Sequence, residues 1–457
     1  MKILLIYPLI REFMAPSMPP LGLAYIATSL KGAGHEIKVV DLNGDRENGL
    51  SYLTKLLSNE SFGMIGVSSI ITQYKRVKEL GKLIKSVVPH TPLILGGSGP
   101  TSIPELYLKN CNADIVCMGE GEEAVKEIAD YIQNKMPLEL CKGIIFKKQD
   151  GSYVNTGKRS QIKDINTIKF PAWEMFYTIK VYLENYLFKH GRKKGISVLS
   201  TRGCPGECNY CMCNFGRMLR MRTAENIFSE IEALVRKYDI EHVHFIDDTF
   251  ITTVKRIREI SDFFKNEFRS LTWSANVRVN FVKPDVLKIM ADSNCVSLAY
   301  GIESGSPTVL DYMKKGFTAE QASNAIKWTR EAGISMTTYF MIGMPCETKE
   351  TVRETIDFCK QNLVGGEFFF VTPIPGAELY EYAKENKIIN DEDVYMEHVG
   401  EVRDFLVNLT NMSNEELFDL KEQAEHEIRE HLKKYNIMVK ESIRKNPREV
   451  ICSLPRF

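Results

Sequence analysis

Short apolar runs alternate with segments of helical period over residues 1–138. Leu21–Leu30 and Arg76–Val87 carry apolar residues at helical spacing. Five runs between such segments read as strands, namely Lys2–Leu9, Glu36–Leu42, Met64–Ile70, Pro92–Leu95 and Ala113–Met118. Strands that alternate with helices favour a parallel sheet covered on both faces. The pattern therefore predicts an α/β domain with a doubly wound, Rossmann-like sheet.

The pattern changes over residues 139–190. Gly143–Lys147 and Tyr153–Val154 flank Asp150-Gly151, which is typical of a β-hairpin turn. An irregular stretch with Pro171 follows. We interpret this part as a hairpin and a connector between two domains.

A second series of strands and helices occupies residues 191–385. Thr223 and the pair Thr318/Gln321 have the form of helix N-caps. Six strands are expected, at Ile196–Ser200, His242–Ile246, Leu271–Asn276, Ser297–Ile302, Met336–Ile342 and Glu367–Thr372. Six units are fewer than the usual eight, so we expect a partial (β/α)6 TIM-like barrel. Residues 386–457, rich in Glu, Lys and Leu, are expected to form a helical C-terminal extension.

Composition and charge narrow the class of protein. Formal net charge is zero over 457 residues, so the chain as a whole has no bias toward nucleic acid or anionic membranes. No stretch approaches the roughly 18 apolar residues of a membrane-spanning helix. Pro8 and Arg11 interrupt the apolar N-terminus, which we interpret as a strand rather than a signal peptide. Eleven cysteines, most of them isolated, indicate a reducing compartment, and we expect a cytoplasmic enzyme.

One cysteine cluster carries recognisable chemistry. Cys204, Cys208 and Cys211 have the spacing C-x3-C-x2-C directly after the first strand of the second domain. Thiolates suit iron–sulfur clusters or zinc, and a cluster with only three protein thiolates keeps one iron open for a ligand. The carboxyl ends of barrel strands are also where such folds build active sites. A structural zinc site that uses Cys213 as fourth ligand is the alternative.

The sequence here resembles the radical SAM superfamily, whose motif is C-x3-C-x-aromatic-C. Tyr210 stands at the aromatic position. The resemblance implies a [4Fe–4S] cluster on the three cysteines, with S-adenosylmethionine on the open iron. One electron, supplied by a donor such as flavodoxin or ferredoxin, would then cleave S-adenosylmethionine to a 5′-deoxyadenosyl radical.

The same resemblance assigns further residues to the binding of S-adenosylmethionine. Asp247 and Asp248 end the second strand, near the expected amino group of the methionine moiety; helix capping is the alternative role. Arg278, in the run WSANVRVN, would neutralise the carboxylate, with a surface salt bridge as the alternative. The remaining residues assigned in this way are Asn276, Glu303, Ser304 and Gly343.

The first domain has candidate ligand loops after its strands. A doubly wound sheet binds ligands beyond its strand carboxyl ends. The run MPPLGLAYIATSLKGAGHEIKVVD and the segments GG…PTSIPE and GEGEEAV, followed by the cysteine motif, resemble the cobalamin-binding class of radical SAM enzymes. The resemblance implies cobalamin contacts from Pro8, Leu21, Ser69, Gly96, Gly97, Gly119 and Glu120. No D-x-H-x-x-G segment is present, so cobalamin is expected to bind without a histidine ligand. His35 should lie at the opposite edge of the sheet.

Several functions can be weighed against these motifs. The leading hypothesis is a cobalamin-dependent methyltransferase that acts on an unactivated carbon of a small molecule or natural product. The alternative is cyclisation, rearrangement or oxidation by the same architecture without methyl transfer. A methylthiotransferase would need a second cluster, and Cys111, Cys117 and Cys141 lack the expected positions. A zinc-bound scaffold is the non-enzymatic reading. The sequence shows no motif that identifies the substrate.

Overall fold

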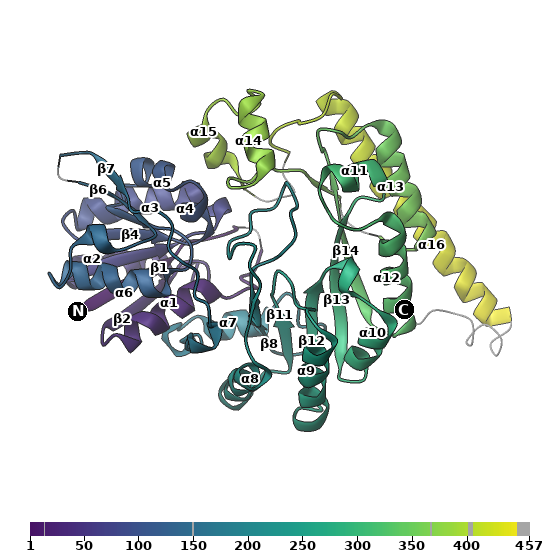
Figure 1. Cartoon of the computed structure of the whole chain (residues 1–457), viewed down its shortest axis with the longest axis horizontal. Coiled ribbons are helices and arrows are strands. Elements are labelled where there is room, and N and C mark those ends of the chain that lie inside the picture. The colour runs from purple at the N-terminus through teal and green to yellow at the C-terminus, as the bar shows by residue number, and fades with distance from the viewer. Residues whose placement is uncertain (13, 149, 366–367, 401–404, 446–457) are drawn as a thin grey trace.

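The computed structural model describes residues 1–457 except 13, 149, 366–367, 401–404 and 446–457. Figure 1 shows two α/β units side by side, the first in purple and blue and the second in teal and green. Helices α14 and α15 lie between them at the top of the view. No helix in the described part of the chain is long and apolar enough to cross a membrane.

The first unit is built on a seven-stranded sheet of order β2-β1-β3-β4-β5-β6-β7. The first five strands pair in parallel, as expected: β1 (Lys2–Tyr7), β2 (Glu36–Asp41), β3 (Met64–Ser68), β4 (Leu93–Gly96) and β5 (Ile115–Cys117). The hairpin β6 (Ile144–Lys147) and β7 (Tyr153–Asn155) adds to β5 in antiparallel fashion. The hairpin thus belongs to the first sheet, whereas the sequence pattern only indicated that it follows the fifth strand.

Helices cover both faces of this sheet. Alternate residues of β1 divide between the two cores: Ile3 and Leu5 face α1, whereas Leu4 and Ile6 face α2 and α3. The helices are α1 (Leu21–Gly32), α2 (Gly49–Asn59), α3 (Tyr74–Val87), α4 (Ser98–Ser102), α5 (Pro104–Asn110) and α6 (Gly121–Ile132). The connector then contributes α7 (Ile179–Glu184) before the second sheet begins.

The second unit is an open parallel sheet of order β15-β14-β13-β12-β11-β8. Its strands are β8 (Gly195–Val198), β11 (His242–Phe245), β12 (Thr272–Val277), β13 (Cys295–Glu303), β14 (Ser335–Ile342) and β15 (Phe368–Phe370). The expected partial barrel of six strands is confirmed. Glu367, which the predicted sixth strand included, lies outside the described residues.

Helices pack on the outer face of this sheet. They are α8 (Ala224–Tyr238), α9 (Val254–Glu267), α10 (Pro284–Ala291), α11 (Pro307–Tyr312), α12 (Ala319–Glu331) and α13 (Lys349–Gln361). The predicted caps are confirmed, because Thr223 accepts from the Asn226 amide and Thr318 forms a capping box with Gln321. Outward-facing side chains such as Trp273, Leu298 and Phe340 are completely buried against these helices.

The C-terminal part is helical, with α14 (Glu378–Glu385), α15 (Glu392–His398) and α16 (Asn414–Lys445). Asp393 of α15 joins the first unit, since Lys78 lies 2.7 Å from its carboxylate and Tyr74 also donates to it. Glu427 of α16 accepts two hydrogen bonds from Arg353 of α13, at 2.7 and 2.9 Å. The extension therefore contacts both units.

Candidate functional site

The three motif cysteines lie on one loop that leaves and re-enters the second unit at the same place. The loop spans residues 203–219, and its ends are joined by the short antiparallel pair β9 (Thr201–Arg202) and β10 (Arg220–Met221). Gly203 has φ +96°, and a side chain there would lie 2.2 Å from the Met218 carbonyl. The Cys204 amide donates to the Gly216 carbonyl across the loop, at 3.1 Å. The chain can therefore reverse direction here only with glycine before the first cysteine.

The middle of the cysteine loop is fixed by backbone contacts to two helices. The Asn209 amide donates to the carbonyl of Met313, and its side chain to the carbonyl of Tyr312, at 3.2 and 2.7 Å. The Asn209 carbonyl accepts from the Leu379 amide at the start of α14, at 2.9 Å. Cys208 is buried, Cys204 is half-buried and Cys211 is exposed. The loop therefore has a defined shape while one of its thiols faces outward.

Arg278 lies directly against the thiols. Its Nη1 is 3.8 Å from Cys204 Sγ and 3.9 Å from Cys208 Sγ, and its Nη2 donates to the Lys315 carbonyl at 2.8 Å. A Cβ at Gly206 would lie 2.2 Å from Arg278 Nη1, so the motif glycine makes room for the guanidinium. These contacts do not support the alternative of a surface salt bridge. A cation here stabilises thiolates and any anionic cluster that they hold.

Tyr210, Glu303 and Lys315 form a second group beside the cysteines. Lys315 is only 5% exposed, and its Nζ lies 2.9 Å from Tyr210 Oη and 3.5 Å from Glu303 Oε1. Tyr210 also donates to Glu303, at 3.3 Å. Glu303 has φ +70°, and a Cβ at Gly301 would lie 2.4 Å from its carboxylate. The sequence reasoning missed Lys315, which no local motif distinguishes from the exposed Lys314 beside it.

The two aspartates after β11 have different surroundings. Asp247 is buried and accepts from the amides of Ser200 and Thr201, both at 2.6 Å, and from the Ser200 hydroxyl. Burial raises the pKa of Asp247 to about 6. Asp248 is exposed and close enough to Cys211 and Cys213 to interact with them electrostatically. Neither aspartate caps α9, because Thr253 does. Asp247 thus holds the strand end before the cysteines, and Asp248 is the one that faces the loop.

Ser304 and Gly343 lie at the carboxyl ends of β13 and β14. The Ser304 hydroxyl is 2.9 Å from Thr355 Oγ1 and accepts from the Ser306 amide, so it is already engaged within the protein. Gly343 has φ +109°, and its amide donates to the buried carboxylate of Glu347, which also accepts from the Met344 amide. Burial raises the pKa of Glu347 to about 7. Contact of Ser304 or Gly343 with S-adenosylmethionine remains a prediction.

The concave face of the second sheet is less tightly covered than its outer face. On the central strand β13 the outward residues Leu298, Tyr300 and Ile302 are at most 1% exposed, whereas the inward residues Ala299 and Gly301 are partly exposed. Asn276 on β12 and Tyr339 and Met341 on β14 are inward and partly exposed as well. Residues in the middle of a sheet keep such exposure only when the space in front of them is unfilled. The cysteine loop thus borders a chamber on this face.

Near the amino ends of β11 and β12 the inward residues form a buried polar cluster, which Phe188 and His190 cover. Ser274 Oγ lies 2.8 Å from both His242 Nε2 and His244 Nδ1, and His242 Nδ1 lies 2.8 Å from Thr272 Oγ1. Burial lowers the pKa of His242 to about 2 and that of His244 to about 3, so both imidazoles are neutral. Tyr339 and Phe369, with ring centroids 6.1 Å apart, provide an aromatic wall on β14 and β15.

The carboxyl edge of the first sheet exposes backbone. Gly97 and Gly119 are exposed with φ +102° and +78°, and Gly96 is half-exposed. Around Gly119 no atom lies within 4 Å of where a Cβ would stand, so a ligand can approach this backbone closely. Among the predicted contacts, Leu21 begins α1, Pro8 follows β1 and is buried, and the Ser69 hydroxyl donates to the Ile70 carbonyl. Glu120 is bound by Arg202 and Arg220 of the second unit.

This edge fits a corrinoid that carries no histidine ligand. His35 precedes β2 at the amino edge, with Nδ1 3.3 Å from the N-terminal amine, as the sequence predicted. The strand order places β1 between β2 and β3, so the crossovers reverse there and leave a crevice at the carboxyl edge. Exposed glycines beside that crevice offer a flat surface for a planar ring. Pro8, Leu21, Ser69, Gly96, Gly97, Gly119 and Glu120 remain predictions as cobalamin contacts.

The chemistry of the loop, three thiols beside the Arg278 guanidinium, suits an anionic iron–sulfur cluster, and the other cysteines differ in their surroundings. Cys111, Cys117 and Cys141 are buried in the first unit, and burial raises the pKa of each thiol to about 12. The Cys213 thiol lies 2.8 Å from the Gly216 carbonyl, to which it donates. Within the described residues no three His, Cys, Asp or Glu side chains, the three motif cysteines included, already converge on one metal-ion position.

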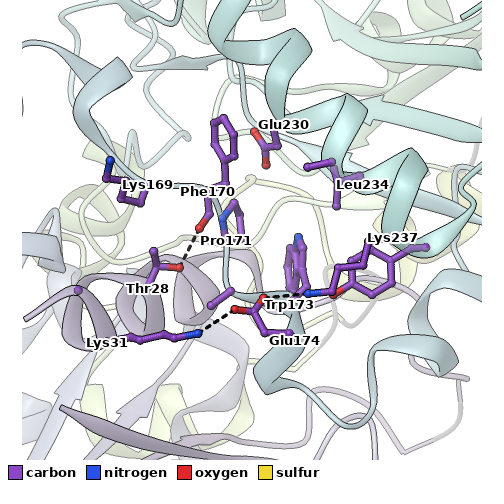
Figure 2. A pocket seen from close by; sticks show the side chains of 14 residues that line it. Thr28, Lys31, Lys169, Phe170, Pro171, Trp173, Glu174, Glu230, Leu234 and Lys237 are labelled. Atoms are coloured by element: carbon purple, nitrogen blue, oxygen red, sulfur yellow. Dashed lines mark hydrogen bonds and ion pairs between the residues drawn. The ribbon is translucent and has the colours of Figure 1, made fainter. Parts of the chain in front are cut away.

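A separate cavity of about 550 Å³ lies between α1, the connector and α8. Figure 2 shows Lys31 and Lys237 reaching Glu174 from two sides, at 3.2 and 3.5 Å. The cavity follows the second halves of α1 and α8, and none of the cysteines lines it. It is therefore distinct from the candidate site.

Comparison with known proteins identifies both units. Residues 198–359 match the family described as the radical SAM superfamily, and residues 12–129 match the B12 binding domain. An uncharacterized methyltransferase of Pyrococcus horikoshii is 31% identical, over 85% of this chain and 84% of its own. The cytidylyl-2-hydroxyethylphosphonate methyltransferase of Streptomyces wedmorensis is 28% identical, over 86% and 84%.

Two solved structures share the fold. The cobalamin-dependent S-adenosylmethionine radical enzyme OxsB superposes with a TM-score of 0.70 at 18% identity. That superposition covers 84% of this chain but only 55% of OxsB. The radical S-adenosylmethionine methyltransferase TsrM of Kitasatospora setae gives a TM-score of 0.70 at 18% identity, over 85% of this chain and 75% of TsrM.

Proposed function

Because the chain belongs to the radical SAM superfamily, in the class that carries a B12-binding domain, we propose that it is a cobalamin-dependent methyltransferase acting on an unactivated carbon. Both curated relatives described above bear the name methyltransferase. Cyclisation, rearrangement or oxidation without methyl transfer is the less favoured alternative.

The observation that carries the proposal is that the carboxyl edges of the two sheets face each other. Gly376, after β15, lies between them, since a Cβ there would be 3.2 Å from Met212 of the cysteine loop and 3.5 Å from Ser102 of the first unit. The corrinoid edge and the cysteine loop therefore border a common space. Methyl transfer between two cofactors and one substrate requires this proximity.

Each group near the chamber has a role that its position supports. When bound, the cluster, S-adenosylmethionine and cobalamin supply radical generation and a transferable methyl group. Cys204, Cys208 and Cys211 hold the cluster, and Arg278 balances its negative charge. Lys315 and Glu303 offer a cation and an anion to the zwitterionic end or the ribose of S-adenosylmethionine. The loop packing against α11 and α14 keeps bulk water from the thiols on that side.

The substrate is a small molecule or natural product that fits the chamber. Its aromatic wall of Tyr339 and Phe369 favours a molecule with an apolar face. An external one-electron donor of the flavodoxin or ferredoxin type reduces the cluster. We place the enzyme in the cytoplasm, since isolated thiols are typical of reducing compartments. Neither nucleic acid nor a membrane is expected as a partner.

Product analysis tests this function. Protein reconstituted without oxygen is supplied with iron, sulfide, hydroxocobalamin, S-adenosylmethionine, a strong one-electron reductant and candidate substrates, and the nucleosides are separated by mass spectrometry. Methyl transfer yields both 5′-deoxyadenosine and S-adenosylhomocysteine, and the second product requires hydroxocobalamin. Formation of 5′-deoxyadenosine alone, with or without the corrinoid, would contradict methyl transfer. The Cys208→Ala variant, which lacks one cluster ligand, is the control and should form neither product through the cluster.

A further inference from the structure

The stem of the cysteine loop contains an unfavourable pair of charges. Arg202 and Arg220 are directly opposite each other in the two-residue ladder of β9 and β10. They are 3% and 5% exposed, so water screens neither guanidinium. Like charges opposite each other destabilise an antiparallel pair. The stem is only two residues long on each side, so this repulsion acts on the part of the chain that joins the two ends of the loop.

One carboxylate from the other domain binds both arginines. Glu120 Oε1 lies 2.7 Å from Arg202 Nη1 and 2.8 Å from Arg220 Nη1, and Oε2 lies 2.7 Å from Arg220 Nη1. The Ile162 amide donates to Oε2 at 2.8 Å. Glu120 is 8% exposed, and these partners keep its pKa below the ordinary value although burial acts in the opposite direction. The carboxylate thus ties the two sides of the stem together.

Glu122 has a different place in the same cluster. Its Oε1 accepts only from Arg202 Nη2, at 2.5 Å. The Arg202 guanidinium also lies over the rings of Tyr25 and Phe215, 5.4 and 4.8 Å from their centroids. Glu122 therefore orients Arg202 but does not bridge the stem. This difference between two neighbouring carboxylates makes the role of Glu120 testable.

Glu120 connects two sites that must act together. It follows Gly119, whose exposed backbone lies at the corrinoid edge, and Arg202 stands two residues before Cys204. We propose that Glu120 is a positioning residue that closes the stem of the cysteine loop from the corrinoid domain, so that cluster retention and corrinoid affinity depend on each other. The proposal rests on the function proposed above. Because coupling between two sites is reciprocal, each cofactor should strengthen binding of the other by the same factor.

The test compares the Glu120→Gln variant of the full-length protein with the variants Glu122→Gln and Glu123→Gln, which replace two carboxylates of α6. Iron and sulfide are measured after anaerobic reconstitution, and the Kd for hydroxocobalamin is measured by absorbance titration before and after the cluster is installed. Wild-type protein should bind hydroxocobalamin about tenfold more tightly with the cluster present. Glu120→Gln should retain less than half of the wild-type iron, and its two Kd values should be equal. Glu123→Gln, an exposed residue paired with Lys126, should match wild type, and Glu122→Gln should lie between the two.

Several outcomes would overturn the proposal. A Glu120→Gln protein with wild-type iron, or with the wild-type ratio of the two Kd values, contradicts it. If Glu120→Gln does not fold, Glu120→Asp replaces it, because the shorter side chain keeps the charge but cannot reach both arginines; normal iron in that variant contradicts the proposal equally. Wild-type protein that holds iron but no hydroxocobalamin would instead refute the proposed function, and the iron comparison alone would then decide the role of Glu120 in the stem.

Discussion

Replacement of Gly203 by alanine should separate cluster binding from folding. Gly203 has φ +96°, and an added Cβ would lie 2.2 Å from the Met218 carbonyl and 3.0 Å from the Gly216 carbonyl. Carbon–oxygen contacts normally exceed about 3.3 Å, so the Met218 backbone must retreat by about 1 Å. Because Gly216 accepts from the Cys204 amide, this movement also disturbs the hydrogen bond that orients the first cysteine.

The expected magnitude follows from two contributions. A left-handed conformation costs a residue other than glycine about 1–2 kcal/mol, and loss of one backbone hydrogen bond costs about 1 kcal/mol. A total of about 2–3 kcal/mol lowers the population of the closed loop roughly 30- to 150-fold. Gly203→Ala protein should therefore bind little iron after reconstitution, whereas the rest of the chain should remain folded.

Gly157→Ala is the matched control for this experiment. Gly157 has φ +79°, and no atom lies within 4 Å of where a Cβ would stand. Alanine at position 157 therefore has the same kind of backbone strain as alanine at position 203, but its Cβ does not clash with a carbonyl oxygen. The assay is iron and sulfide content together with electron paramagnetic resonance of the reduced cluster. A Gly203→Ala protein with the iron content and spectrum of the Gly157→Ala protein would refute the reasoning.

Two further substitutions test buried groups that contact the carboxyl ends of β13 and β14. Glu347→Gln keeps an oxygen for the Gly343 and Met344 amides but cannot ionise. Because the pKa of Glu347 in the folded protein is about 7 and its ordinary value is 4.5, the wild type should lose up to about 3 kcal/mol of stability as pH rises from 4.5 to 7. The variant should show no such loss, and denaturant unfolding at several pH values measures the difference. Lys315→Met removes the buried cation beside Glu303 and should raise the Kd for S-adenosylmethionine about tenfold or more, measured by equilibrium dialysis with labelled ligand.

Each of these substitutions has a control. For Glu347→Gln, the exposed Glu350 nearby on α13 is replaced by glutamine and should leave the pH profile of wild type intact. For Lys315→Met, the adjacent and exposed Lys314, which pairs with Glu378, is replaced by methionine. Equal S-adenosylmethionine affinity in the Lys314 and Lys315 variants would exclude a cofactor contact by Lys315.

Local patterns in the sequence were sufficient for most of the fold. Short apolar runs between segments of helical period predicted the strands of both sheets within a few residues, and Thr223 and Thr318 cap helices as their neighbours indicated. These features depend on contacts within one element, so a short window of sequence contains the signal. The spacing of the three cysteines predicted the cluster loop for the same reason.

Contacts between distant segments were beyond that reasoning. Glu120 and Arg202 are separated by 82 residues, and nothing in the run around Glu120 distinguishes a carboxylate that faces a ligand from one that bridges two arginines. Addition of the hairpin to β5 depends on pairing between edges, which the hairpin sequence does not encode alone. Lys315 meets Glu303 only because the chain returns after α11.

Co-occupancy of the two cofactor sites in one anaerobic sample tests the central claim most directly. The account predicts about four iron atoms and one corrinoid per chain after reconstitution, together with an electron paramagnetic resonance signal of the reduced cluster that changes when S-adenosylmethionine is added. Protein that binds iron without any corrinoid, or a cluster whose signal is indifferent to S-adenosylmethionine, would contradict it.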